Sequence, residues 1–206
     1  MSLQKLDAPT SALVALATAI ALGDEAQVEQ HCRTCQALGA PETWVDELLL
    51  QSTLMVGWPR ALIAAAICRR ISGPAHWVED GADYDRVPEW QERGEAVCRT
   101  IYGANYPRLR SNMQELHPAL DAWMVTEGYG RTLGRSGLDL ARRELTIVAQ
   151  VAVQGAERQL HSHLRGALHA GVSPAALDSA LALVRPALDA RARALLDSVR
   201  ERVGVP

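Results

Sequence analysis

A glutamate and a histidine in the C-terminal half of the sequence have the types and spacing of an acid–base pair. Glu144 lies in the first turn of an expected helix, and His163 lies on the next expected helix. If these helices pack antiparallel about the turn at 155–156, the carboxylate and the imidazole reach similar heights and can touch. In a partly desolvated cleft such a pair can pass a proton. The alternative is a structural hydrogen bond at a helix interface.

Side chains close in sequence could bind an anionic substrate beside this pair. Arg165 and Gln159 share the expected helix of His163, and Arg142 and Arg143 lie one helix earlier. Arginine binds carboxylates through two parallel N–H donors. Gln159, one turn before His163, could orient the ligand or the imidazole. For the arginines, the alternative is a solvated helix face.

The histidines do not have the spacing of a metal site. His161 and His163 are two residues apart, so they point to different sides of a helix. Metal ligands on one helix use spacings of roughly three or four residues. We therefore expect no bound metal.

The segment His31–Cys35 offers thiol chemistry in the N-terminal half. It contains a Cys-x-x-Cys, Cys32 and Cys35, directly after His31. The two cysteines share a helix face, so a disulfide or a pair of reactive thiols is geometrically possible. Cys32 falls in a later turn, however, and lacks the N-terminal dipole that lowers a thiol pKa. The alternative is small apolar packing, which is also our interpretation of Cys68 and Cys98.

The elements that must position these residues are predicted to be helices. Phe is absent, aromatic residues make up 4% of the chain, and 48% of the 206 residues are apolar. This composition favours helix over sheet and is sufficient for a real core. We predict an all-α fold. Helices are expected near residues 11–22, 25–38, 42–56, 59–71, 88–101, 106–116, 118–133, 139–153, 157–169, 174–184 and 187–202.

The two halves of the chain are related by an internal duplication of helical-hairpin units. Shifting the sequence by 132 residues places 12–50 on 144–182, and ten of the 39 positions are then identical. The identical pairs are Leu13/Leu145, Ala17/Ala149, Gly23/Gly155, Glu25/Glu157, Gln27/Gln159, His31/His163, Arg33/Arg165, Gly39/Gly171, Asp46/Asp178 and Leu49/Leu181. One unit leaves apolar faces uncovered, so we expect pairing of the copies and association of subunits to complete the core.

The duplication and a Gly-, Pro- and Asp-rich stretch predict three parts. Residues 1–72 form a degenerate N-terminal repeat, 73–94 a connecting segment, and 95–206 a C-terminal repeat. The first copy is degenerate because Ala12 stands where the second has Glu144.

Charge and hydropathy exclude several classes of partner. The net charge is −3 without a run of like charges, so nucleic-acid binding is not expected. No uninterrupted apolar stretch reaches about eighteen residues, so no membrane-spanning helix is expected. Four cysteines without a secretory signal indicate reduced thiols and a cytoplasmic protein.

Short motifs in the C-terminal half closely resemble the carboxymuconolactone decarboxylase family. They are His117-Pro118-Ala119-Leu120, Tyr129-Gly130, Gly137-Leu138-Asp139-Leu140, Arg143-Glu144-Leu145, Gly155-Ala156-Glu157-Arg158-Gln159-Leu160 and His163-Leu164-Arg165-Gly166-Ala167-Leu168. The N-terminal copy is similar more loosely, through Leu49-Leu50-Gln51 and Gly57-Trp58-Pro59-Arg60-Ala61-Leu62. The resemblance implies an all-helical fold, homo-oligomers such as trimers or hexamers, and no cofactor.

The resemblance also implies an activity, the decarboxylation of a small carboxylated lactone or a related unsaturated acid. In that scheme His163 is the proton donor or electrostatic stabiliser, and Glu144 orients it or acts as the partner base. Arg165 would bind a carboxylate of this anionic substrate, with Gln159 beside it.

The same superfamily contains alkylhydroperoxidase D, whose motif is a Glu, eleven residues, Cys-x-x-Cys, three residues and a His. Counting from Glu144 places Ala156 and Gln159 at the cysteine positions and His163 at the histidine. Without a thiolate, no sulfenic acid or disulfide can form there. The alternative functions are therefore a thiol peroxidase that uses His31, Cys32 and Cys35, and a non-catalytic helical oligomer.

Overall fold

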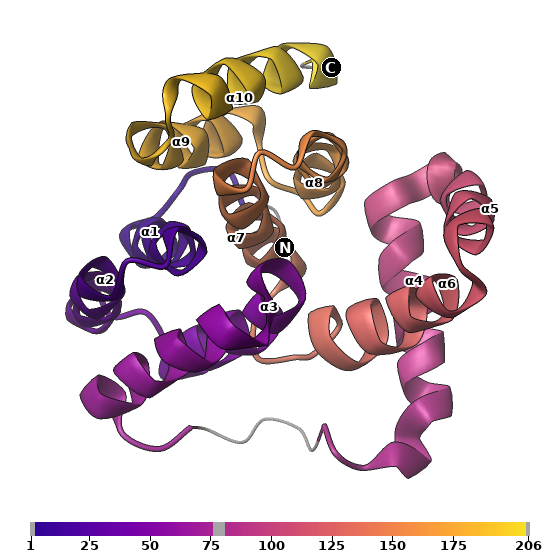
Figure 1. Cartoon of the computed structure of the whole chain (residues 1–206), viewed down its shortest axis with the longest axis horizontal. Helices are drawn as coiled ribbons and strands as arrows, with labels where there is room; N and C mark the ends of the chain where they lie inside the picture. The colour runs from indigo at the N-terminus through magenta and orange to yellow at the C-terminus, as the bar shows by residue number, and fades with distance from the viewer. Residues whose placement is uncertain (1–2, 76–80, 205–206) are drawn as a thin grey trace. The chain divides into compact units, whose positions relative to one another are not determined.

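A computed structural model describes residues 3–75 and 81–204, which form helices joined by turns and short connections (Figure 1). One isolated backbone bridge joins Leu3 and Val172. The all-α prediction is confirmed. The chain divides into two compact units, one made of residues 1–76 and 137–206 and the other of residues 77–136.

The first unit contains both copies of the predicted hairpin. Its helices are α1 (Ala8–Leu22), α2 (Glu25–Ala37), α3 (Glu42–Ser72), α7 (Leu140–Val153), α8 (Glu157–His169), α9 (Pro174–Val184) and α10 (Ala190–Val203), with the 3₁₀ turn η4 (Arg185–Ala187). The second unit contains η1 (Tyr84–Arg86), α4 (Val87–Tyr102), η2 (Gly103–Asn105), α5 (Tyr106–Leu116), α6 (Pro118–Trp123) and η3 (Met124–Leu133).

The segments expected at 42–56 and 59–71 are the two halves of α3, and non-helical backbone at Gly57, with φ +78°, breaks the helix between them as expected. One expected helix differs from the observed one. The helix expected at 118–133 is α-helical only to Trp123 and continues as the π-helix η3. Local periodicity does not reveal the π-helix, because it is a small change of winding within a continuous apolar pattern.

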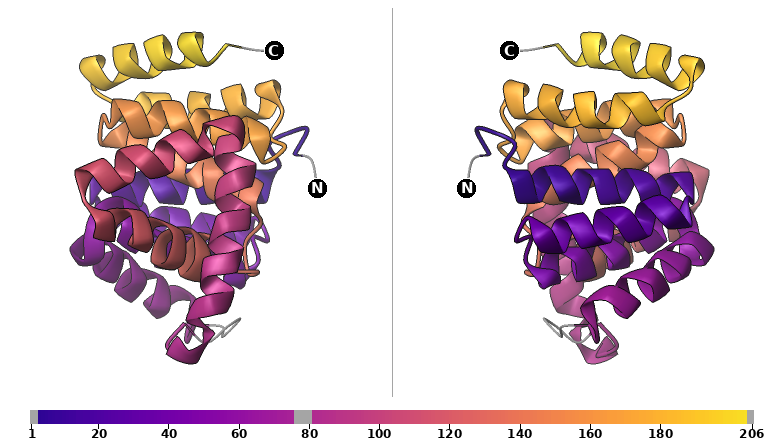
Figure 2. Two further views of the ribbon diagram at one scale, coloured as in Figure 1. Left: turned by 90° about the vertical axis from the view of Figure 1, so that its right-hand side faces the viewer. Right: turned by 90° about the vertical axis from the view of Figure 1, so that its left-hand side faces the viewer.

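The two copies share one core. The equivalent helices α1 and α7 pack against each other, and α2 covers α1 and α3 at the edge of the unit (Figures 1 and 2). The contact between α1 and α7 buries Leu13 and Leu16 on one side and Leu145 and Val148 on the other. The duplicated halves therefore cover each other's apolar faces, as the repeat predicts.

A buried polar seam joins α3 to α7. Arg143 donates to Glu47 at 2.8 Å, to the Gln51 side-chain oxygen at 3.2 Å and to the Leu138 carbonyl at 3.0 Å. Gln51 in turn donates to Thr146 at 2.8 Å. Arg143 and Glu47 are almost fully shielded from solvent. The seam fixes the height and rotation of α7 against α3, because a buried ion pair tolerates little displacement.

By length and composition α3 is also long and apolar enough to cross a membrane. No such helix was expected, because the sequence has no uninterrupted apolar stretch of that length. Core helices of globular proteins can have the same composition. Here the break at Gly57 divides the helix, and Glu47, Gln51 and Ser52 on its first half are buried in polar contacts with α7. We therefore describe α3 as a core helix of the first unit.

The compact units do not follow the repeat boundaries expected at 72 and 94. Residues 95–136, which we assigned to the C-terminal repeat, lie in the second unit. There α4 packs closely on η3, because Gly130 has no side chain where a Cβ would come within 2.0 Å of the Trp90 carbonyl oxygen. The assignment of the sequence repeats themselves stays a prediction.

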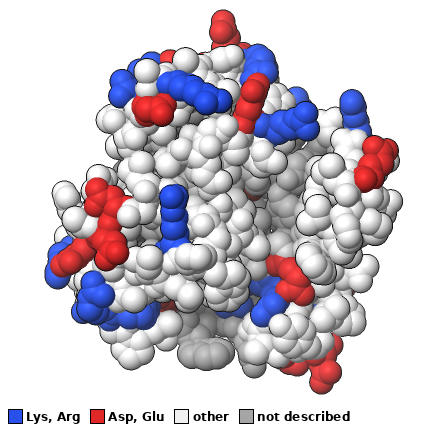
Figure 3. All heavy atoms as spheres, viewed as in Figure 1, with Lys and Arg blue, Asp and Glu red and all other residues white. Residues whose placement is uncertain are grey.

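Acidic and basic side chains are interspersed on the face of the molecule shown in Figure 3. One exposed example is the pair of Arg202 and Glu157, whose side chains are each 51% exposed. Such pairs contribute little to stability because water screens them. The pair of Arg143 and Glu47 differs because it is buried, so water does not screen it.

Replacing Arg143 by Met should lower the free energy of unfolding by about 3–5 kcal/mol, because it leaves Glu47 buried without its counter-charge. Urea denaturation followed by circular dichroism measures the change. Arg202→Met, the same substitution at an exposed ion pair, is the matched control and should change stability little. Equal effects of the two substitutions would contradict the role assigned to the seam.

Candidate functional site

Glu144 and His163 meet on neighbouring helices of the second repeat. Asp139 caps α7 by accepting the Arg142 N–H, and α7 and α8 are connected by a turn in which Gly155 has φ +64°. This hairpin brings His163 Nδ1 to 2.9 Å from Glu144 Oε2. The contact expected from the sequence is therefore present, whereas the catalytic roles of the two residues stay a prediction.

The pair is buried, and one carboxylate oxygen of Glu144 can accept a further hydrogen bond. Glu144 is 0% exposed and His163 is 6% exposed. The second carboxylate oxygen, Oε1, has no hydrogen-bond partner among the residues that the structure describes. Buried carboxylate oxygens are normally paired. The site can therefore accept one further donor, such as a proton or a polar group of a ligand.

Arg142 and Arg143 are both engaged by other residues. Arg143 belongs to the seam with Glu47. Arg142 donates to Asp139 at 2.6 Å and to Asp7 at 3.0 Å. The anion-binding role considered for these two arginines is thus replaced by structural pairing within the first unit.

The two expected substrate-binding residues lie on α8 and are exposed. Gln159 is four residues before His163 and therefore shares its side of the helix. Arg165 is two residues after His163, so its side chain leaves α8 on a different side. The binding roles of both residues stay predictions.

A second group of reactive side chains lies where α2 packs on α3. We call Cys32, Cys35 and Cys68 the thiol cluster. All three are buried and unoxidised. Cys32 Sγ lies 4.0 Å from the Ser72 hydroxyl oxygen. His31, the third residue of the expected redox set, is half-buried, and burial lowers its pKa.

The groups around Cys32 lower the pKa of its thiol. The hydrogen bond with Cys68, helped by Ser72 and the charges of Arg69 and Arg33, lowers the pKa of Cys32 to about 7. Burial raises the pKa of Cys35 to about 12. Cys32 lies in a later turn of α2, as expected, so the dipole at the start of that helix does not act on it; the groups that lower its pKa come mainly from α3.

Sequence reasoning also missed the partner of Cys32. We interpreted Cys68 as apolar packing, but the hydrogen bond to Cys32 and burial raise its pKa above the usual range. The available signal was the pair Cys68 and Ser72, which are four residues apart and share a face of α3. Only the packing of α3 against α2 shows that this face meets Cys32.

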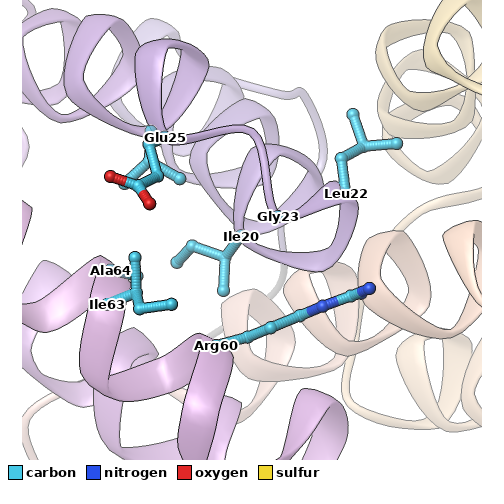
Figure 4. Close-up of a pocket in the computed structure, with 8 residues that line it drawn as sticks. Ile20, Leu22, Gly23, Glu25, Arg60, Ile63 and Ala64 are labelled. Atoms are coloured by element: carbon cyan, nitrogen blue, oxygen red, sulfur yellow. The ribbon is translucent and has the colours of Figure 1, made fainter.

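A cavity of about 210 Å³ lies between the end of α1, the start of α2 and the second half of α3 (Figure 4). Apolar side chains form most of its wall, and Arg60 reaches across one side and donates to the Ala21 carbonyl. Neither Glu144 nor His163 lines it. This cavity therefore belongs to the first repeat and is separate from the acid–base pair.

Comparisons with known proteins agree with the duplicated fold. The model of the "Carboxymuconolactone decarboxylase family" matches residues 1–69 and 118–201, which include both copies. The chain is also 40% identical over 63 residues to the "Uncharacterized 15.0 kDa protein in nqo9-nqo10 intergenic region" of Paracoccus denitrificans. That match covers 30% of this chain and 47% of the relative, so it spans about half of the relative's length.

Titration of the thiols by the ultraviolet absorbance of thiolate should show a step near pH 7 that Cys32→Ser removes. Cys68→Ala should move this step upward, towards the ordinary thiol value of 9.0, because it removes the main hydrogen bond to Cys32. Cys98→Ala is the control and should leave the step in place, since the pKa of Cys98 is raised to about 12. An unchanged step in Cys68→Ala would contradict this assignment.

Proposed function

The chain belongs to the carboxymuconolactone decarboxylase family, and from this premise we propose that it catalyses cofactor-free acid–base chemistry on a small carboxylated lactone or a related unsaturated acid. The observation that carries the proposal is the buried hydrogen bond between Glu144 and His163, with Glu144 Oε1 left unpaired among the described residues. A buried carboxylate and imidazole in contact can hold and move a proton without any cofactor.

Glu144 would determine which ring nitrogen of His163 carries the proton. An ionised carboxylate only accepts hydrogen bonds, so its contact with Nδ1 favours the imidazole form that carries its proton there. Nε2 is then the ring nitrogen that exchanges a proton with the substrate.

In the proposed reaction, the bond between the substrate carbon and its carboxylate breaks and carbon dioxide leaves. The electron pair of that bond moves into the conjugated lactone carbonyl and forms an enolate. His163, as imidazolium, stabilises this negative charge and delivers the proton to carbon that completes the product. Solvent then returns a proton to His163.

The substrate's carboxylates require donors next to the pair. Gln159 lies on the side of α8 that carries His163 and can donate from its amide. Arg165 supplies a guanidinium on another side of α8, and its contribution would come through association with a second subunit. Separate variants of the two residues distinguish these contributions, because only Gln159 can act within one subunit.

Glu144→Gln and His163→Asn should each lower the turnover of carboxymuconolactone by roughly 10²- to 10⁴-fold, the usual contribution of a general acid–base group. The assay follows loss of the lactone and release of carbon dioxide by the purified protein. His161→Asn is the matched control, because His161 lies on the same helix and points away from the pair.

Circular dichroism shows whether each variant keeps its helices. Full turnover in folded Glu144→Gln and His163→Asn would remove these residues from the mechanism. A wild-type protein that does not decarboxylate this lactone or related unsaturated acids would overturn the proposed reaction itself.

A further inference from the structure

The cavity between α1, α2 and the second half of α3 takes no part in the proposed decarboxylation, because it is separate from the acid–base pair. Its floor is apolar and closed, since Ile20, Val28 and Ala64 line it and are each at most 2% exposed. Its rim carries two exposed charged side chains, Arg60 and Glu25. An apolar floor below a charged rim is suited to a small amphipathic molecule.

The internal duplication shows what keeps this space open. The shift of 132 residues that relates the two copies places the second half of α3 on α10. The buried residues Ala64 and Ile67 then fall on the buried residues Leu196 and Val199. The second repeat therefore has a leucine where the first has only the methyl group of Ala64. A leucine at position 64 would occupy part of the cavity, so the alanine preserves it.

The rim of the cavity also differs from the equivalent place in the second repeat. Gly23 and Gly155 are equivalent turn glycines with positive φ. A Cβ at Gly23 would lie 3.4 Å from Arg60 Nε, whereas a Cβ at Gly155 would lie 3.9 Å from a methyl carbon of Leu195. The residue of α10 equivalent to Arg60 is Ala192. The first repeat thus has a guanidinium against its turn glycine, where the second has an aliphatic side chain.

Arg60 is held at the rim and keeps donors for a ligand. Its Nη1 donates to the Ala21 carbonyl near the end of α1, which fixes the guanidinium across one side of the cavity (Figure 4). Among residues 3–75 and 81–204, no carboxylate forms an ion pair with Arg60. A guanidinium has five N–H donors, so most of those of Arg60 are available. Two parallel donors of this kind match the two oxygens of a carboxylate.

Glu25 is the opposing charge at this rim. It is the first residue of α2, where the positive end of the helix dipole stabilises its carboxylate. Figure 4 shows Glu25 and the guanidinium of Arg60 on opposite sides of Ile20. An anion paired with Arg60 is therefore repelled by Glu25 only across the cavity, in a solvent-screened setting.

The volume of the cavity limits the size of its ligand. The cavity holds about 210 Å³, and a closed apolar cavity of about 150 Å³ is enough for benzene. A hydrocarbon body of roughly six to eight carbons therefore fits the floor, and a carboxylate attached to it reaches the rim.

We propose that this cavity is a binding site for a small monocarboxylate with a compact hydrocarbon body. The body packs on Ile20, Val28 and Ala64, and the carboxylate pairs with the guanidinium of Arg60. The inference is independent of the proposed decarboxylase function, because the two sites share no residue.

Three probes with the same ring test the charge of the ligand on the full chain: cyclohexanecarboxylate, cyclohexylmethanol and cyclohexylmethylamine. Methyl NMR titration gives the affinity and the place of binding together. The carboxylate should bind at least roughly tenfold more tightly than the alcohol, with the amine weakest, and should shift the methyl signals of Ile20, Val28 and Ile63. Equal binding of all three probes, tightest binding of the amine, no binding of the carboxylate, or shifts confined to other methyl groups would each overturn the proposal.

Variants test the floor of the cavity. Ala64→Leu, which copies the second repeat, should abolish binding of cyclohexanecarboxylate by filling the space. Ala66→Leu is the matched control, because Ala66 is exposed on the same helix and does not line the cavity. Binding that survives Ala64→Leu in a protein with its helices intact by circular dichroism would contradict the assigned site.

Variants of the rim test the two charges separately. Arg60→Gln should reduce the affinity for the carboxylate to that for the alcohol, whereas Glu25→Gln should increase it by removing the repulsion. If Arg60→Gln folds poorly, the probe series on the wild-type protein and the Glu25→Gln result decide the role of charge. An unchanged or lower affinity in Glu25→Gln would count against an anion at this rim.

Turnover of the lactone separates this proposal from the proposed function. Ala64→Leu should leave turnover unchanged, because position 64 lies in the first repeat and away from the acid–base pair. Loss of both carboxylate binding and turnover in folded Ala64→Leu would contradict the separation of the two sites.

Discussion

The buried ion pair between Arg143 and Glu47 is the constraint on which the first unit depends. Two charges without solvent require close geometry and additional hydrogen bonds, which Gln51 and the Leu138 carbonyl provide. Gly137 leaves the space for Glu47, because a Cβ there would come within 2.6 Å of its side chain. With Arg143 held towards α3, the next residue of α7 necessarily points in another direction. That direction is towards α8 and His163.

The two repeats carry different buried polar and sulfur-containing side chains on similar helices. In the second copy, α7 carries the buried Glu144 and the positions equivalent to a peroxidase motif hold Ala156 and Gln159. In the first copy, the residue equivalent to Glu144 is Ala12, a fully packed core residue. The cysteines of this first copy do not lie at the cysteine positions of that motif. The Glu144–His163 contact and the buried cysteines Cys32 and Cys35 thus lie at different helix interfaces.

The backbone break at Gly57 separates the half of α3 that contacts α7 from the half that carries Cys68. Its positive φ lets the chain turn between the two halves of α3 without leaving helical hydrogen bonding on either side. The first half carries the polar seam to α7, and the second half carries Cys68 to α2.

The sequence by itself determined the helical class, most helix positions, the duplication and the candidate pair of Glu144 and His163, because periodicity, glycine turns and hairpin length are local properties. It also gave the residue types of both sites. Tertiary structure decided that Arg143 pairs with Glu47, that the chain divides at residues 77 and 136, and that Cys32 of α2 lies against Ser72 of α3. These facts depend on which faces of distant helices pack together. No local pattern encodes that choice, since partners far apart in sequence are selected by the free energy of the whole core.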